Sequence, residues 1–169
     1  DVVIESLGIS TQRMTSVLWD SESGRALAPA IVWQDTRYAA EVTKYGEEWN
    51  AFLFPRIGRT AGIQSPFLWA AHQIKENPEV AKAQAAGTLR FGSIDTWLLW
   101  HLTGGATYAT TATLANTQGA YHLGTGDWVR EWPEALGFPS EILPSIEDDG
   151  VDALEHLALH VELLAGDEV

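Results

Sequence analysis

Segments with the hydrophobic pattern of strands open this chain, and segments with the pattern of helices follow them. Residues 14–19 are mostly apolar or β-branched and end at the polar turn "DSESG", and residues 2–10 and 25–33 have the same extended character. From residue 35 to residue 53, apolar residues instead recur three or four positions apart, and Asp35 or Thr36 is suited to cap the first turn. Strands interspersed with helices predict a layered α/β domain.

Helical patterns dominate the rest of the chain. Residues 65–84 predict a helix interrupted at Asn77-Pro78, and residues 88–93 predict a short strand. Residues 93–105, "SIDTWLLWHLTGG", carry a capping residue, a helical apolar stripe and a Gly-Gly stop. Residues 125–146 predict a short helix bounded by prolines, whereas periodicity alone does not decide between a helix and a strand for residues 151–164.

Size and charge restrict the function classes. The 169 residues, 46% of them hydrophobic, suffice for one domain with a sizeable core. The formal net charge of −13 argues against a nucleic-acid surface, which needs clustered Lys and Arg. No apolar run approaches the roughly 18 residues of a membrane span, and no signal peptide is recognisable. The absence of cysteine fits a reducing compartment, so a cytoplasmic protein with small-molecule partners is expected.

Two groups of polar residues stand next to the predicted strands. Gln12-Arg13 directly precedes residues 14–19. The guanidinium of Arg13 can hold hydroxyls or anions at this position. A solvated charge at the end of a strand is nevertheless the more common situation. The motif "VWQDTR" places Trp33, Asp35 and Arg37 between an extended segment and a helix, where ligand contacts collect. A core tryptophan followed by a helix cap explains that motif equally well.

The carboxylate of Asp167 is the third candidate. It follows an apolar run and a glycine near the C-terminus, a position suited to a general base, although an exposed terminal acid is the simpler interpretation. His156 and His160 are four residues apart, but no third ligand follows at the spacing of a zinc site. The eight tryptophans allow a sugar-binding module, but their positions within apolar stripes favour core packing.

Three stretches together resemble one protein family. "LGISTQRMTSVLWDSESGRALAPAIVWQDTR" is similar to the segment of glycerol kinases and other FGGY carbohydrate kinases in which "GI-x-x-QR" precedes "WD-x-x-x-G" and "AIVWQD-x-R". "FGSIDTWLLWHLTGG" resembles their "FG-x-x-DTWL-x-W-x-LTGG", and "LLAGDEV" resembles their "AGDQ". The resemblance covers nearly the whole chain, and it is specific because the three motifs occur in the family's order.

This resemblance implies an α/β domain of the actin-like, ribonuclease H-like type, with a mixed β-sheet flanked by helices. It implies transfer of phosphate from ATP, assisted by Mg²⁺, to a hydroxyl of a polyol or sugar. Residues 1–169 would form most of the N-terminal domain without its first phosphate-binding hairpin, and the C-terminal nucleotide domain would be absent, so the fragment alone is expected to be inactive. Family members often assemble into dimers or tetramers, so a homo-oligomer is one expected state.

The resemblance also implies roles for individual residues. Asp167 would be the general base and would act beside Mg²⁺-ATP, so its link to the metal would be indirect. Arg13 would donate hydrogen bonds to substrate hydroxyls, and Trp33 would form a wall of the pocket. Phe67 falls where glycerol kinases have a substrate-contacting Tyr, and Glu168 falls where they have a Gln.

Departures from the family pattern concern the substrate. Met14 stands where glycerol kinases have a hydroxyl-binding Glu, and a thioether makes no comparable hydrogen bond. Phe67 lacks the hydroxyl of Tyr, and Thr111 replaces an Asp of the family pattern. These differences predict a substrate other than glycerol. They also leave open a non-catalytic homologue that binds a small polyhydroxylated ligand.

Overall fold

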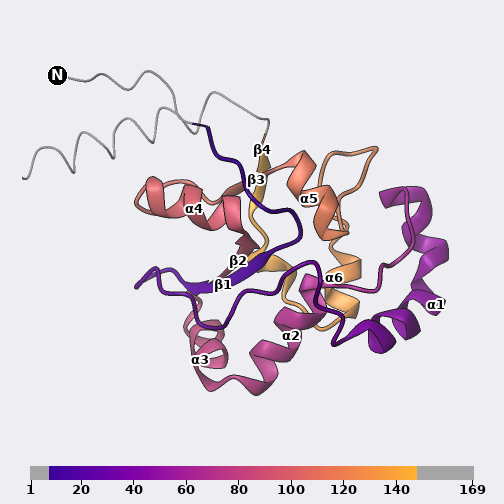
Figure 1. The fold of residues 1–169 in the computed structure, drawn as a ribbon, viewed down its shortest axis with the longest axis horizontal. Helices are drawn as coiled ribbons and strands as arrows, with labels where there is room; N and C mark the ends of the chain where they lie inside the picture. Colours follow the sequence, from indigo (N-terminus) through magenta and orange to yellow (C-terminus); the bar gives the residue numbers. More distant parts are fainter. Residues whose placement is uncertain (1–7, 148–169) are drawn as a thin grey trace, which may run out of the picture.

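Two pairs of strands form the β-structure in residues 8–147, the part of the chain that our computed structural model describes (Figure 1). Strand β1 (Ser16–Asp20) runs antiparallel to β2 (Leu89–Ser93), with Leu18 opposite Phe91. Strand β3 (Ala109–Thr111) runs parallel to β4 (Ser145–Glu147). The α/β class is confirmed, and within the described residues the antiparallel and parallel pairings belong to two separate sheets.

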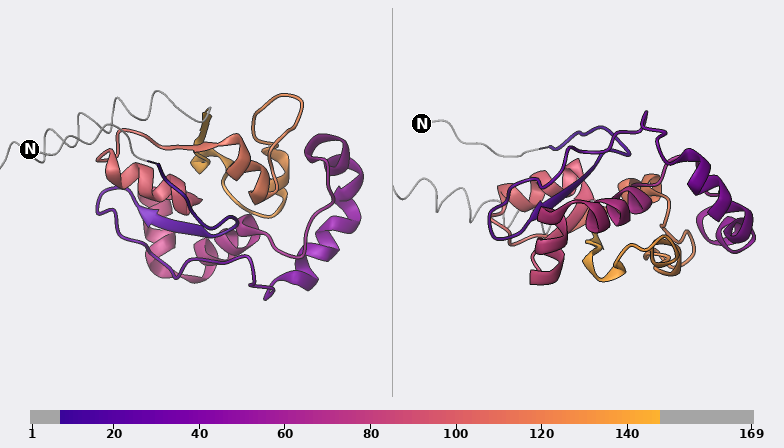
Figure 2. Two further views of the ribbon diagram at one scale, coloured as in Figure 1. Left: turned by 45° about the horizontal axis from the view of Figure 1, so that its top comes forward. Right: turned by 90° about the horizontal axis from the view of Figure 1, so that it is seen from below.

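Helices surround these strands. Helices α3 and α4 both pack against β1 and β2, whereas α1 lies at the far end of the molecule, as Figures 1 and 2 show. No helix among the described residues combines the length and apolar character needed to cross a membrane. The helices in chain order are α1 (Ala39–Ile57), α2 (Pro66–Glu76), α3 (Pro78–Ala86), α4 (Ile94–Leu102), α5 (Ala112–Gln118), α6 (Glu131–Ala135) and the 3₁₀ helix η1 (Ser140–Ile142).

Local caps explain the break between α2 and α3. The Ser65 hydroxyl accepts a hydrogen bond from the Leu68 N–H at 3.2 Å, and Pro66 occupies the first helical position, where its missing N–H costs nothing. Asn77 ends α2, and its side chain accepts from the Glu79 N–H at 3.0 Å to begin α3. The predicted interruption at Asn77-Pro78 is therefore confirmed.

Helix α1 begins later than the sequence predicts. Its first residue is Ala39, and the residue before it, Tyr38, makes no capping hydrogen bond through its side chain. The Asp35 carboxylate accepts instead from the Arg37 N–H at 3.0 Å and from Arg37 Nε at 2.8 and 2.9 Å. Asp35 thus closes a turn ahead of the helix, and its predicted capping role is wrong.

The polar turn "DSESG" folds β1 back on the following segment. The Asp20 carboxylate accepts from the Ser23 hydroxyl at 2.6 Å and from the Ser23 N–H at 3.0 Å, and hydrogen bonds from the Ser23 and Thr88 side chains lower the pKa of Asp20 to about 2. Residues 25–33 then pair with β1 only at Ala26 and Ile31, as isolated bridges. The extended character predicted for this segment is confirmed, although it forms no continuous strand.

Other predicted elements agree with the structure in part. The strand predicted at residues 88–93 is β2, the helix predicted at 93–105 is α4, and the region 125–146 contains α6 and η1. Within the strand predicted for residues 2–10, only residues 8–10 are described, and they form no strand. The segment 151–164 lies outside the described residues.

Aromatic side chains fill the core beneath β2. Phe67 lies 5.5 Å from Phe91 and 5.3 Å from Phe138, measured between ring centroids, and Phe91 lies 4.9 Å from Phe138. All three rings are buried. Core packing is confirmed for several tryptophans, which are at most 6% exposed: Trp19, Trp69, Trp128 and Trp132.

Candidate functional site

A single backbone bridge brings two of the predicted site residues together. The Ser16 N–H donates to the Ile31 carbonyl at 2.9 Å, and the Ile31 N–H donates to the Ser16 carbonyl at 3.0 Å. In an antiparallel pair, residues that precede one partner lie beside residues that follow the other. Met14 and Trp33, each two residues from the bridge, are therefore neighbours at the same end of this ladder.

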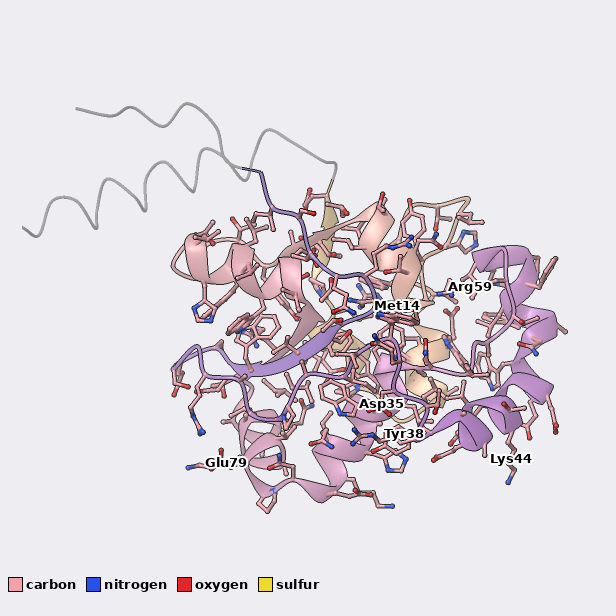
Figure 3. The ribbon with its side chains drawn as sticks, viewed as in Figure 1. Met14, Asp35, Tyr38, Lys44, Arg59 and Glu79 are labelled. Carbon is pink, nitrogen blue, oxygen red and sulfur yellow. The ribbon has the colours of Figure 1, made fainter. Side chains whose placement is uncertain are left out.

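These residues open onto a pocket of about 600 Å³, called here the Arg13 pocket. Arg13 is exposed, and Trp33 is 49% exposed, so both side chains are accessible to a ligand. Figure 3 shows Met14 near Arg59, which comes from the loop after α1. The lining residues are Gln12, Arg13, Met14, Trp33, Arg59, Asn116 and Thr117.

Met14 has an unusual backbone conformation. Its φ of 56° is in the left-handed region, and no other non-glycine residue among 8–147 has a positive φ. For a residue with a side chain, this conformation is uncommon and costs free energy, of order 1–3 kcal/mol. Such strain is typical of ligand-binding segments, and here it directs the half-buried Met14 side chain towards the pocket.

Arg59 connects the loop after α1 to the end of α5. Helix α1 ends at Gly58, with a φ of 71°, and Arg59 Nη2 then donates to the carbonyls of Asn116 and Thr117, both at 3.0 Å. A cation at the C-terminus of a helix is favourable because the carbonyl dipoles point towards it. Partial burial nevertheless lowers the pKa of the Arg59 guanidinium. Arg59 is thus held in place by α5 and faces the pocket.

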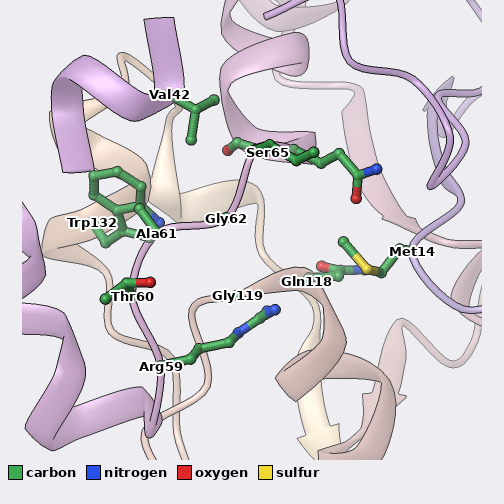
Figure 4. A pocket seen from close by; sticks show the side chains of 12 residues that line it. Met14, Val42, Arg59, Thr60, Ala61, Gly62, Ser65, Gln118, Gly119 and Trp132 are labelled. Carbon is green, nitrogen blue, oxygen red and sulfur yellow. The ribbon is translucent and has the colours of Figure 1, made fainter. Parts of the chain in front are cut away.

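A second pocket, of about 220 Å³, adjoins the first and is called here the Gln118 pocket (Figure 4). Met14 and Arg59 line both pockets. In Figure 4, Trp132 and Val42 lie on one side of this pocket, and Met14 and Gln118 lie on the other. The lining residues are Met14, Val42, Arg59, Thr60, Ala61, Gly62, Ile63, Gln64, Ser65, Gln118, Gly119 and Trp132.

Glycine is required beside Arg59. Gly119 follows α5 with a φ of 92°, and a Cβ added there would lie 3.0 Å from Arg59 Nη2. A side chain at this position would therefore be strained and would press on the guanidinium. Gly119 allows Arg59 to approach the carbonyls of α5.

The other predicted site residues lie apart from these pockets. Asp35 and Arg37 pair with each other at 2.5 Å, which lowers the pKa of Asp35 and raises that of Arg37. Neither of them lines the Arg13 pocket or the Gln118 pocket. Phe67 is fully buried in the aromatic core and also lines neither pocket. Asp167 and Glu168 lie outside the described residues.

Sequence reasoning did not identify Arg59 or Gln118. The glycine-flanked segment "GRTAG" was the only local signal for Arg59, because glycines mark loops in which backbone and ligand approach closely. Gln118 sits at the end of a short Thr- and Ala-rich segment and carries no local signal. Both residues gain their positions from tertiary contacts.

No metal-binding cluster occurs in the described part of the chain. Between residues 8 and 147, no group of three or more His, Asp or Glu side chains is arranged to hold an ion. His156 and His160 lie outside this range. The two pockets offer hydrogen bonds from the guanidinium groups of Arg13 and Arg59 and from amide and hydroxyl side chains, with tryptophan and methionine as apolar walls.

Sequence comparisons connect the chain to known kinases. Residues 1–152 match the model of the FGGY family of carbohydrate kinases, N-terminal domain. A glycerol kinase of Thermus brockianus is 37% identical over 158 residues, which is 90% of this chain and 31% of the relative. A glycerol kinase of Bradyrhizobium diazoefficiens is 36% identical over 178 residues, which is 98% of this chain and 34% of the relative. The chain therefore spans about a third of the length of these relatives.

A solved structure has a similar fold. Plasmodium falciparum glycerol kinase with ADP superimposes with a TM-score of 0.79 and 27% identity, covering 94% of this chain and 32% of that chain.

Proposed function

Because the chain belongs to the FGGY family of carbohydrate kinases and shares their actin-like fold, we propose that its protein transfers the γ-phosphoryl group of ATP to a polyol or sugar hydroxyl. The observation that carries this proposal is the Arg13 pocket, where Arg13 and Trp33 of the family motifs open onto one space. The chain spans about a third of its relatives, so the proposal concerns the whole protein. We place the reaction in the cytoplasm, where ATP is available.

Three residues receive roles in this reaction. Arg13 donates hydrogen bonds to substrate hydroxyls through its fork of N–H groups, and Trp33 packs against the carbon chain. Asp167 removes the proton of the acceptor hydroxyl as the phosphoryl group arrives. Mg²⁺ neutralises phosphate charge in such reactions, but the described residues offer no cluster of ligands for it.

The presence of Thr111 in place of the family's Asp gives little support to a non-catalytic homologue. Its hydroxyl accepts from the Leu114 N–H and caps α5. Asp and Thr are both good residues for this position, so replacing the family Asp by Thr preserves the cap. The alternative, a binding protein without kinase activity, therefore depends on Met14.

Replacing Arg13 by alanine tests the proposed function. In the full-length protein, an ATP-coupled assay across polyols, pentuloses and hexuloses should identify a substrate. For that substrate, the kcat/KM of Arg13→Ala should be about 10- to 100-fold lower than that of the wild type, because a charged hydrogen bond contributes about 1.5–3 kcal/mol. The control is Arg25→Ala, since Arg25 is exposed, pairs with Glu79 and lies outside both pockets. Phosphorylation of no compound in the panel would refute the proposal.

A second substitution tests the role of Met14 in substrate choice. Met14→Glu restores the acceptor that glycerol kinases have at this position, so kcat/KM for glycerol should rise about 5- to 100-fold, the equivalent of about 1–3 kcal/mol per buried hydroxyl. Met14→Leu, which adds no hydrogen bond, should leave glycerol activity unchanged. A wild-type protein that already prefers glycerol would show that Met14 does not exclude it.

A further inference from the structure

The carboxamide of Gln118 is buried without a hydrogen-bond partner. The residue is 3% exposed, and neither Nε2 nor Oε1 bonds to any described residue. An amide offers two donors and one acceptor, and leaving these groups unpaired in the interior destabilises a protein. Gln118 lines a pocket but exposes less than 1 Å² at each of these two atoms, so its side chain must turn towards the pocket before a bound molecule can supply the missing partners.

Arg59 provides a second polar group to the same pocket. Its Nη2 is engaged by the α5 carbonyls, but a guanidinium carries five N–H donors in total. The ion pairs found among the described residues involve Arg25, Arg37 and His72, and none involves Arg59. The positive charge of Arg59 is thus not neutralised by a described carboxylate, and it favours an electron-rich group in the pocket.

The Gln118 pocket and the Arg13 pocket share two lining residues. Met14 and Arg59 line both, so a ligand held by Arg13 and Trp33 can extend past Met14 towards Gln118. The volume of about 220 Å³ admits several non-hydrogen atoms, since one water occupies about 30 Å³. The Met14 thioether makes only weak hydrogen bonds, so the next strong partners along this path are Gln118 and Arg59.

We propose that the Gln118 pocket receives the distal, oxygen-bearing end of an open-chain substrate of five or six carbons. Gln118 and Arg59 form hydrogen bonds to that end, which carries a hydroxyl or a carboxylate. The inference rests on the proposed function for its choice of ligand class. A three-carbon polyol held at Arg13 would leave Gln118 unpaired, so the longer substrate binds more tightly.

Calorimetric titration of the full-length protein tests this assignment. The ligands are glycerol, D-arabinitol and D-gluconate, measured without ATP so that binding is separated from turnover. In the wild type, at least one of the two longer ligands should bind about tenfold or more tightly than glycerol. Gln118→Leu should abolish that difference in affinity. The affinity of Gln118→Leu for glycerol should differ from that of the wild type by less than about twofold. Gln118→Glu should weaken gluconate more than arabinitol, because a second carboxylate repels the ligand.

The control is Gln73→Leu, a partly buried glutamine on α2 outside both pockets, which should leave all three affinities unchanged. In urea unfolding, Gln118→Leu should retain or raise the midpoint, because it removes a buried unpaired amide. A fall in the midpoint would show that Gln118 serves the fold instead.

Equal affinities for the three ligands, no binding, or equal weakening of all three by Gln118→Leu would overturn the proposal. The assay of phosphoryl transfer is read separately. The expected binding pattern without any transfer would refute the proposed function alone, and transfer that does not depend on Gln118 would refute this inference alone.

Discussion

Replacing Asp167 by asparagine should lower the rate of phosphoryl transfer by about 10²- to 10⁴-fold, the usual contribution of a general base. Asparagine keeps the size of the side chain but cannot accept the proton of the acceptor hydroxyl. Substrate affinity should change little, because the proposed binding contacts come from Arg13 and the pocket walls. Single-turnover kinetics, with calorimetry of the substrate alone, measure the two effects separately.

The neighbouring acid supplies the control for this experiment. Glu168→Gln makes the same chemical change one residue further along, and it installs the residue that the resembling kinases have there. Activity should therefore persist in Glu168→Gln. Turnover of Asp167→Asn equal to that of the wild type would remove Asp167 from the mechanism.

Replacing Phe67 by alanine should destabilise the protein by about 3–5 kcal/mol, the cost of deleting a buried aromatic ring. The ring is fully buried and packs against Phe91, Phe138 and Trp128. Chemical unfolding of the full-length protein measures the change. Phe54→Ala is the matched control, because Phe54 is 60% exposed and its loss should cost less than about 0.5 kcal/mol.

Phe67→Tyr decides between two positions for this side chain. If Phe67 stays in the aromatic core, the new hydroxyl is buried without a partner and should cost about 1–3 kcal/mol. If Phe67 contacts the substrate, as the resemblance implies, the tyrosine should improve glycerol phosphorylation without loss of stability. The second result would contradict a purely structural role for the ring.

Local chemistry made much of the fold predictable. Helices α2, α3 and α4 are bounded by capping residues, by prolines at the first helical position or by terminal glycines. These signals act within one turn, so the sequence around Asn77-Pro78 already marks the boundary between α2 and α3. Strand β3 was not predicted, because its three residues pair with β4 more than thirty positions away. The helix α5 that follows β3 is short and Thr- and Ala-rich, with no clear apolar period.

The candidate site likewise contains residues that sequence motifs indicate and residues that only tertiary contacts bring into place. Arg13 and Trp33 belong to motifs that are continuous in the sequence, so the resemblance already names them as candidates, and both line the Arg13 pocket. Arg59 and Gln118 meet only because the loop after α1 is hydrogen-bonded to the end of α5, and no spacing in the sequence encodes that contact. The Asp35 and Arg37 pair was misinterpreted because a turn and a helix cap use the same residue types.

The bridge between Ser16 and Ile31 has a consequence for how substrate preference can change. Both of its hydrogen bonds are between main-chain atoms, so the spacing of Met14 and Trp33 does not depend on which side chains they carry. Substitutions at Met14 that tolerate its left-handed backbone conformation should therefore change the wall of the pocket while this bridge stays in place. If Met14 contacts the acceptor as proposed, we expect acceptor preference to change through this single side chain while the fold of the domain is kept.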